Sequence, residues 1–415
     1  MRSSFLVLIG ICMLSPFPVI ETFGKSVRVS NLATVIILLS FVLHLAKRKQ
    51  FYFDALFGYI AISFMLLSSW YVVSALLNNA DIESAMLSYS EVLLYLTMSF
   101  SLVQMSSKYS IKSLSQELSS SAFPLFFFGV VFVVFLAYRS IHENIVLLSF
   151  LSTSGLSELQ YSVFSKIFGG DASSAARHSS AYAIGAVLVI SCCCFSGSAR
   201  VWMAIFAVIL LAILASRQAI LAVALTAIVF LISSYSRAGH LFLYCILGLV
   251  AFGVLVSFVP NESFEYLEYK FVQDILHNPR VEQFYIAIYE LENYFFLGKG
   301  YGVLPEGAAF PHNLILFSFH QGGIFALVLS IVVYALVILL LLDFMISRKD
   351  IDNVSIQIRI VSVYFLLCAL VKLSVGVKGD LDFVTWTFLS LSIVIRRICY
   401  FDEKLENEGS LVSGR

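Results

Sequence analysis

The chain has 415 residues, of which 60% are hydrophobic and only 13% are charged, and its mean hydropathy is +0.93. Soluble domains carry about 25% charged residues, so this composition excludes a soluble globular protein. Basic and acidic side chains balance at 26 each, and this neutral total gives no support to nucleic-acid binding.

Long apolar runs recur along the whole chain. Runs of this length cross a hydrocarbon core of about 30 Å, and only helices or closed barrels satisfy their backbone groups in lipid. The runs lack the alternation of barrel strands. We therefore predict an all-α integral membrane protein with about 12 transmembrane helices, over 4–21, 30–46, 53–77, 86–106, 122–138, 180–197, 200–215, 218–235, 239–258, 320–343, 358–376 and 382–396.

The distribution of basic residues sets the orientation. Cytoplasmic loops are enriched in Lys and Arg, and the cluster Lys47-Arg48-Lys49 follows the second predicted span. Placing both termini in the cytoplasm gives every cytoplasmic loop at least one basic residue. Two long segments, 139–179 and 259–319, then lie outside. In the second, residues 263–276 and 280–296 have the periodicity of amphipathic helices, so this segment is predicted to be partly helical.

Polar residues at costly positions are the candidates for function. Arg217 lies in a short external connection, Arg280 begins an amphipathic helix, and His312 precedes the tenth span. Each alone is more simply a boundary anchor or a structural residue. Lys372 lies within a span, where pairing with Glu91 or snorkelling would account for it. The seven cysteines show neither a disulfide framework nor metal spacing, and no metal or cofactor is predicted.

Three stretches, in order, carry a resemblance to a known family. Ser216-Arg217 is followed by an apolar run. Arg280 is followed by an amphipathic helix and then by the sequence NYFFLGKGYG at 293–302. The third stretch, at 311–326, reads PHNLILFSFHQGGIFA. Together they resemble the signature of the O-antigen ligase and polymerase-like family over about residues 180–345. The paired glycines at 322–323 would let the tenth span pack closely or bend.

The resemblance implies a bacterial inner-membrane glycosyltransferase that acts at the periplasmic face on undecaprenyl diphosphate-linked glycans. Arg217 and Arg280 would bind the diphosphate, since guanidinium groups suit phosphate oxygens. His312 would orient or deprotonate the acceptor hydroxyl, a role suited to an ordinary imidazole pKa of about 6.5. Supporting roles are expected for Asn313, as helix cap or imidazole partner, and for Ser216, Arg177 and Gly300.

The same resemblance divides the chain into four regions: 1–179 with the first spans, 180–345 as the ligase-like core including 259–319, 346–401 with the last spans, and the tail 402–415. Two reactions stay open. A ligase transfers the glycan to lipid A-core, which we prefer, and a polymerase transfers it to a lipid-linked repeat unit of O-antigen, capsule or exopolysaccharide. Besides this donor and acceptor, membrane lipids are the expected partners. A lipid-linked oligosaccharide transporter is the rival from another class.

Overall fold

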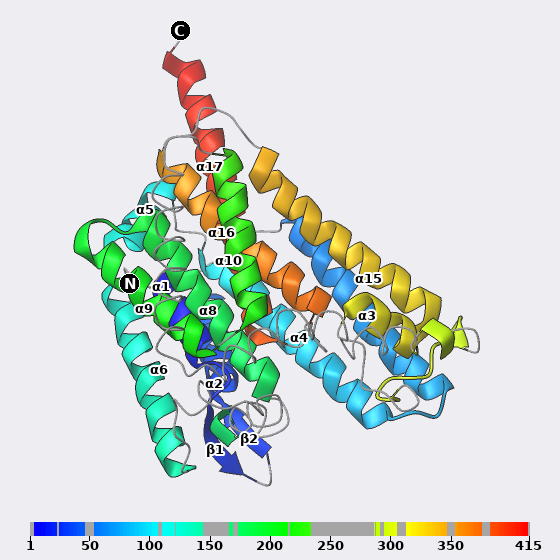
Figure 1. The fold of residues 1–415 in the computed structure, drawn as a ribbon. Helices are drawn as coiled ribbons and strands as arrows, with labels where there is room; N and C mark the ends of the chain where they lie inside the picture. The colour runs from blue at the N-terminus through cyan, green and yellow to red at the C-terminus, as the bar shows by residue number, and fades with distance from the viewer. Residues whose placement is uncertain are drawn as a thin grey trace. The chain divides into compact units, whose positions relative to one another are not determined.

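The computed structural model describes residues 4–22, 25–45, 54–106, 110–120, 122–143, 166–168, 173–214, 216–233, 286, 288–290, 294–304, 313–346, 353–375 and 382–413. Almost all of them are helical (Figure 1). Six described helices are long and apolar enough to cross a membrane: Ala55–Leu77, Ile82–Met105, Phe123–His142, Arg177–Cys194, Leu314–Met345 and Ile356–Ser374. The protein is therefore a multi-pass helical membrane protein.

The chain forms two compact units, the first from Met1–Ala33 and Lys112–Asn278 and the second from Thr34–Ile111 and Pro279–Arg415. The helices of the first unit are α1 (Ser4–Leu14), α5 (Ile111–Ser120), α6 (Phe123–His142), α8 (Ser173–Cys194), α9 (Gly197–Leu214) and α10 (Arg217–Ser233). Those of the second are α3 (Ala55–Leu77), α4 (Ile82–Met105), α15 (Leu314–Ile346), α16 (Asn353–Val375) and α17 (Phe383–Ser413), while α2 (Val29–Leu45) belongs to both.

In the first unit, α1 packs on α6 and α8, and α8 packs on α9 and α10. A short antiparallel hairpin, β1 (Pro18–Thr22) and β2 (Lys25–Arg28), follows α1 (Figure 1). The predicted first span of 4–21 therefore ends at Leu14, and the chain turns there. Phe17 explains the turn, because its ring is fully buried against Phe132, Phe135 and Phe168.

In the second unit, α3 packs on α4 and α15, α17 packs on α4 and α16, and α15 also contacts α16. The helix starts follow local sequence signals. The Asp54 carboxylate accepts a hydrogen bond from the Phe57 N–H of α3 at 3.0 Å, and Asp81 accepts one from Ser84 of α4. An Asp at the N-cap satisfies a backbone donor that the helix leaves free. Asp382 caps α17 in the same way.

Ion pairs join the ends of neighbouring helices at each end of the second unit. At one end Arg396 bridges Asp54, before α3, and Asp343, near the end of α15, with 2.7 Å to each carboxylate. At the other end Lys372 of α16 pairs with Asp382, ahead of α17, at 2.5 Å. Helices α15, α16 and α17 therefore alternate in direction within the second unit. Lys372 takes Asp382 as its ion-pair partner.

The Asp54 carboxylate both caps α3 and pairs with Arg396, and its side chain is buried. Asp54→Ala is therefore expected to lower the free energy of unfolding by about 3 kcal/mol, because it removes a cap and leaves a cation without its buried partner. Asp343→Ala is the matched control. Its carboxylate is 48% exposed, so its loss should cost less than about 1 kcal/mol. Titration with a denaturing detergent compares the two, and equal losses would refute the assignment.

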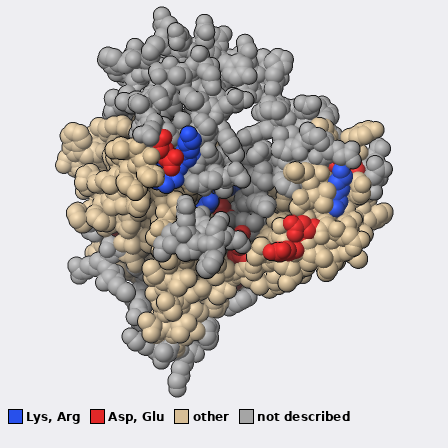
Figure 2. All heavy atoms as spheres, turned by 90° about the horizontal axis from the view of Figure 1, so that it is seen from below, with Lys and Arg blue, Asp and Glu red and all other residues tan. Residues whose placement is uncertain are grey.

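The described surface carries few charges. On the face drawn in Figure 2, Lys, Arg, Asp and Glu gather in a few places, and most of the described surface has none. Many large apolar side chains are exposed along α2, α3, α6 and α15, among them Leu43, Tyr59, Val134 and Leu339. Exposed apolar side chains of this number are expected where lipid is the solvent.

Candidate functional site

The three residues singled out by the sequence are described to different extents. Arg217 is the first residue of α10, and only its backbone belongs to the described part of the chain. Arg280 and His312 lie outside the described residues. The structure describes the segments next to them in the chain: the start of α10, residues 294–304, and the start of α15.

The start of α10 meets the first turns of α8. Ser216 is fully buried, and its hydroxyl lies 2.7 Å from Nδ1 of His178 and accepts a longer hydrogen bond from the Ala219 N–H. One turn further, the Tyr182 hydroxyl donates to Gln218. Arg177 lies beside His178 on α8, which starts at Ser173 and so begins before the predicted boundary at 180. Of the predicted supporting residues, Ser216 thus contacts α8, and Arg177 is the chain neighbour of the histidine that it contacts.

Helix α15 is broken in two at Gly323, whose backbone angles are φ 65° and ψ −157°. The first half-helix, 314–322, runs alongside α3 in the same direction, because Ser318 bonds to Tyr71 and Gln321 accepts from Ser74. The second half-helix, 324–346, runs the opposite way: its start packs Phe325 on Trp70, and its end shares Arg396 with the start of α3 (Figure 1). The chain thus reverses at Gly323, and only the second half is long enough to span a bilayer.

A break in a membrane helix exposes carbonyl groups that need new donors. The segment 294–304 supplies most of them. The backbone N–H of Lys299 donates to the His320 carbonyl at 2.8 Å, and that of Gly300 donates to the Gln321 carbonyl at 3.2 Å. The indole of Trp70 donates to the Gly322 carbonyl at 2.6 Å. In return the Ile324 N–H, which a continuous helix would give to His320, bonds to Phe295.

Glycines make this close contact possible. A Cβ on Gly298 would lie 2.5 Å from backbone atoms of Gln321, and a Cβ on Gly300 would lie 2.5 Å from the side chain of Ala80. Both residues, and Gly302, have positive φ, which glycine adopts without steric cost. The predicted supporting role of Gly300 thus corresponds to a tight turn that holds 298–302 between the break and the turn after α3.

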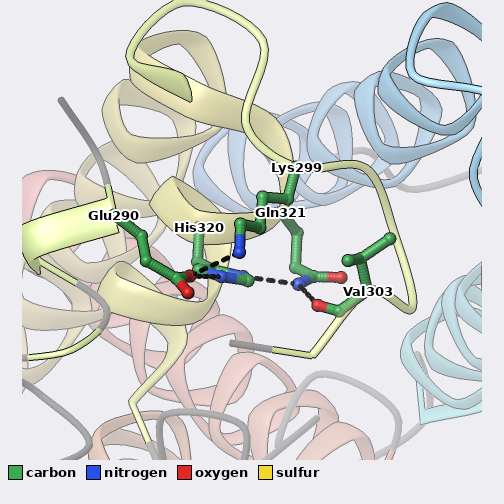
Figure 3. Close-up of polar contacts among 5 residues, drawn as sticks. All are labelled: Glu290, Lys299, Val303, His320 and Gln321. Carbon is green, nitrogen blue, oxygen red and sulfur yellow. Dashed lines mark hydrogen bonds and ion pairs between the residues drawn. The ribbon is translucent and has the colours of Figure 1, made fainter. Parts of the chain in front are cut away.

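Four polar side chains form a cluster beneath this turn, and we call it the 290–321 cluster: Glu290, Lys299, His320 and Gln321 (Figure 3). One oxygen of Glu290 lies 2.8 Å from the Lys299 ammonium and 3.1 Å from Nε2 of His320. Nδ1 of His320 lies 2.8 Å from Nε2, the side-chain amide nitrogen of Gln321. Since an amide nitrogen only donates, Nδ1 of His320 accepts and its Nε2 carries the proton that goes to Glu290. The cluster is a neutral, interlocked network.

Sequence reasoning assigned no role to these four residues. His320-Gln321 is a pair of polar residues within an otherwise apolar run, and such a pair is costly in lipid unless it finds partners. That signal could have marked His320. Nothing local to Glu290 or Lys299 distinguishes them from other charged residues of the segment 259–319, because their partners come from distant turns.

The residue after His312 anchors the start of α15. The side-chain oxygen of Asn313 accepts from the Ile315 N–H at 2.8 Å and from the Leu316 N–H at 3.3 Å, so Asn313 is the helix cap. Its amide nitrogen donates to the Ser374 carbonyl near the end of α16. Of the two roles considered for Asn313, the structure therefore confirms the cap. It also fixes the backbone next to His312 against α16.

The pair Glu290 and Lys299 offers a test of the 290–321 cluster. Lys299→Met should lower the free energy of unfolding by about 3 kcal/mol, because Glu290 would be left buried without its cation. Glu290→Gln combined with Lys299→Met should recover at least half of that loss, since no unpaired charge remains. A double-mutant cycle on the detergent-solubilised protein measures the coupling. Losses that simply add would show that the two residues do not act together.

Within the described residues, no group of three or more His, Cys, Asp or Glu side chains is arranged to hold a metal ion. Comparison of the whole chain with protein-family models gives no match, and comparison with curated proteins gives none. The resemblance to the O-antigen ligase family is therefore carried by the three sequence stretches alone, and the function drawn from it is a proposal.

Proposed function

We propose that this protein transfers a glycan from undecaprenyl diphosphate to an acceptor hydroxyl, as an O-antigen ligase-like glycosyltransferase. About twelve spans cross the bacterial inner membrane, both termini are cytoplasmic, and the reaction takes place at the periplasmic face. The enzyme uses neither a metal ion nor a cofactor. Its partners are the lipid-linked donor, a glycan acceptor and the surrounding lipids.

One observation supports the proposal beyond the sequence itself. The second and third family-like stretches, at 293–302 and 311–326, interlock at the break in α15. Their glycines are needed for the contact, and their polar residues Lys299, His320 and Gln321 form the 290–321 cluster together with Glu290, which precedes the second stretch. Two separate stretches of the family signature thus form one substructure. In the sequence, Arg280 precedes it, and His312 is the residue before the helix cap Asn313. This is the expected arrangement if the signature describes a site.

The chemistry follows from the leaving group. The acceptor oxygen attacks the anomeric carbon, the bond from that carbon to the diphosphate oxygen breaks, and the anomeric configuration inverts. His312 takes the hydroxyl proton, and the diphosphate leaves with the bonding electrons. Arg217 and Arg280 stabilise the growing negative charge, each worth about 3 kcal/mol in a water-poor site. Arg217 is the first residue of α10, where free N–H groups and the helix dipole also favour an anion.

A transport function is the rival, because broken helices are common in transporters. Transporters place such breaks near the bilayer midplane. Here the break contacts Trp70 and Ser74, in the last third of α3 (Ala55–Leu77), and the segment 298–302 contacts Asn78 and Ala80 beyond its end. A break at one surface favours interfacial chemistry over a path through the membrane.

The purified protein in vesicles, given an undecaprenyl diphosphate-linked glycan, tests both the reaction and the acceptor. If the protein is a ligase, it transfers the glycan to the core sugar when lipid A-core is present. With only a second lipid-linked repeat unit present, a ligase gives no elongation. Elongation of the repeat unit without transfer to the core would make the protein a polymerase. Movement of the intact donor across the bilayer, with no transfer to either acceptor, would support the transporter instead.

A further inference from the structure

In the described residues of 288–304, charged side chains are buried and most aromatic side chains are exposed, which is the opposite of a loop in water. Their two charged side chains face inward: Glu290 and Lys299 are about 10% exposed and paired with each other (Figure 3). Four of their five aromatic side chains are exposed, with Tyr289 at 77% and Phe296 at 68%, and Tyr294 and Phe295 exposed as well; only Tyr301 is buried. A loop in water places charges outside and aromatic rings inside. This one is built for an apolar surrounding.

The outward rings continue a lipid-facing surface. The carbonyl of Phe295 accepts from the Ile324 N–H, so the two phenylalanines lie directly at the start of the second half of α15. From there the exposed side chains of Phe325, Val328 and Ile331 follow that half-helix. On α3, to which the segment is bonded through Ser74, the exposed side chains are Val73, Leu76 and Leu77. The aromatic surface therefore extends the apolar surfaces of two membrane helices.

The level of the segment in the membrane follows from its contacts. Ser74 bonds to the Leu297 carbonyl one turn before α3 ends at Leu77, and Gly302 lies against Asp81, the cap of α4. The segment is thus level with the ends of these helices. Aromatic side chains, Tyr and Trp above all, are enriched at this level, where an apolar ring meets a wet head group.

We propose that residues 288–290 and 294–304 lie in the interfacial layer of the bilayer, with Tyr289, Phe295 and Phe296 inserted among the lipid head groups and the upper acyl chains. The ion pair of Glu290 and Lys299 is turned inward because its outer side is lipid. The placement does not rest on the proposed transferase, and a protein of another function would show it equally.

Spin labels measure this placement. Phe296→Cys and Tyr289→Cys are made separately in the full chain, labelled with a nitroxide, and placed in vesicles of phosphatidylethanolamine and phosphatidylglycerol. Collisions with oxygen, which concentrates in lipid, are compared with collisions with a water-soluble nickel chelate. Glu83→Cys, exposed in the first turn of α4, gives the aqueous reference, and Leu66→Cys, exposed on α3, gives the lipid reference. The unsubstituted chain gives the background from its own cysteines.

We expect both labels to give collision ratios between the two references, with oxygen favoured over the nickel chelate. Both replaced side chains are exposed, so neither variant removes core contacts. The proposal is overturned if either label meets the nickel chelate as often as the Glu83→Cys label does. It is also overturned if either label is shielded from both reagents, because protein would then cover the surface.

Discussion

Replacing His312 with alanine is expected to lower kcat for glycan transfer by a factor of about 100 to 10,000, the usual contribution of a general base. KM for the lipid-linked donor should stay close to that of the unsubstituted protein, because Arg217 and Arg280, not His312, are the proposed ligands of the diphosphate. Steady-state transfer to a fluorescent acceptor measures both constants.

Two controls separate this loss from misfolding. Asn313, next in the chain, caps α15 and bonds to the end of α16, so disturbing this turn could itself reduce activity. His312→Gln keeps a side chain of similar size but cannot act as the base, and it should be as inactive as the alanine variant. Arg237→Ala, in a predicted cytoplasmic loop, should keep full activity. Normal kcat in a correctly inserted His312→Ala protein would remove this residue from the mechanism.

Gly323→Ala should largely prevent folding of the second unit. With φ at 65° and ψ at −157°, the residue occupies a region open essentially to glycine alone, and strain of this kind costs about 1–3 kcal/mol. A Cβ would also lie 2.3 Å from the Phe296 carbonyl oxygen, which is backbone and cannot rotate away. We expect a total loss above about 4 kcal/mol, which is exceptional for one substitution. The yield of monodisperse protein and its unfolding midpoint in detergent report the effect.

Gly197→Ala is the matched control for this prediction. Gly197 also has positive φ, at 62°, but no atom lies within 4 Å of an added Cβ. Only the backbone term applies, so the loss should be about 1–2 kcal/mol. A similar effect of the two substitutions would mean that the contact between Phe296 and Gly323 does not hold the break together.

Local patterns were sufficient to predict the helical membrane class. Apolar runs predicted spans that correspond to six described helices able to cross a bilayer, and Asn313 was recognised as a helix cap from its own neighbours. These properties depend on residues within a few positions of each other. They can therefore be read from one sequence with no knowledge of its partners.

Features that depend on distant contacts could not be predicted in this way. The break in α15 was indicated only as a possible bend at Gly322-Gly323, because reversal requires donors from 298–302 and from Trp70. The hairpin after α1 depends on the burial of Phe17 among three rings of other segments. The burial and pairing of Glu290 likewise depend on Lys299 and His320, which are distant in the sequence.

The release of undecaprenyl diphosphate tests the central claim most directly, because this leaving group defines the reaction. It is measured per acceptor glycosylated, for the unsubstituted protein and for Arg217→Ala and Arg280→Ala in vesicles. We predict one diphosphate released for each acceptor glycosylated, with a rate at least about 100-fold lower in each arginine variant. Unchanged rates in both variants, or no release at all from the unsubstituted protein with either acceptor, would contradict the account.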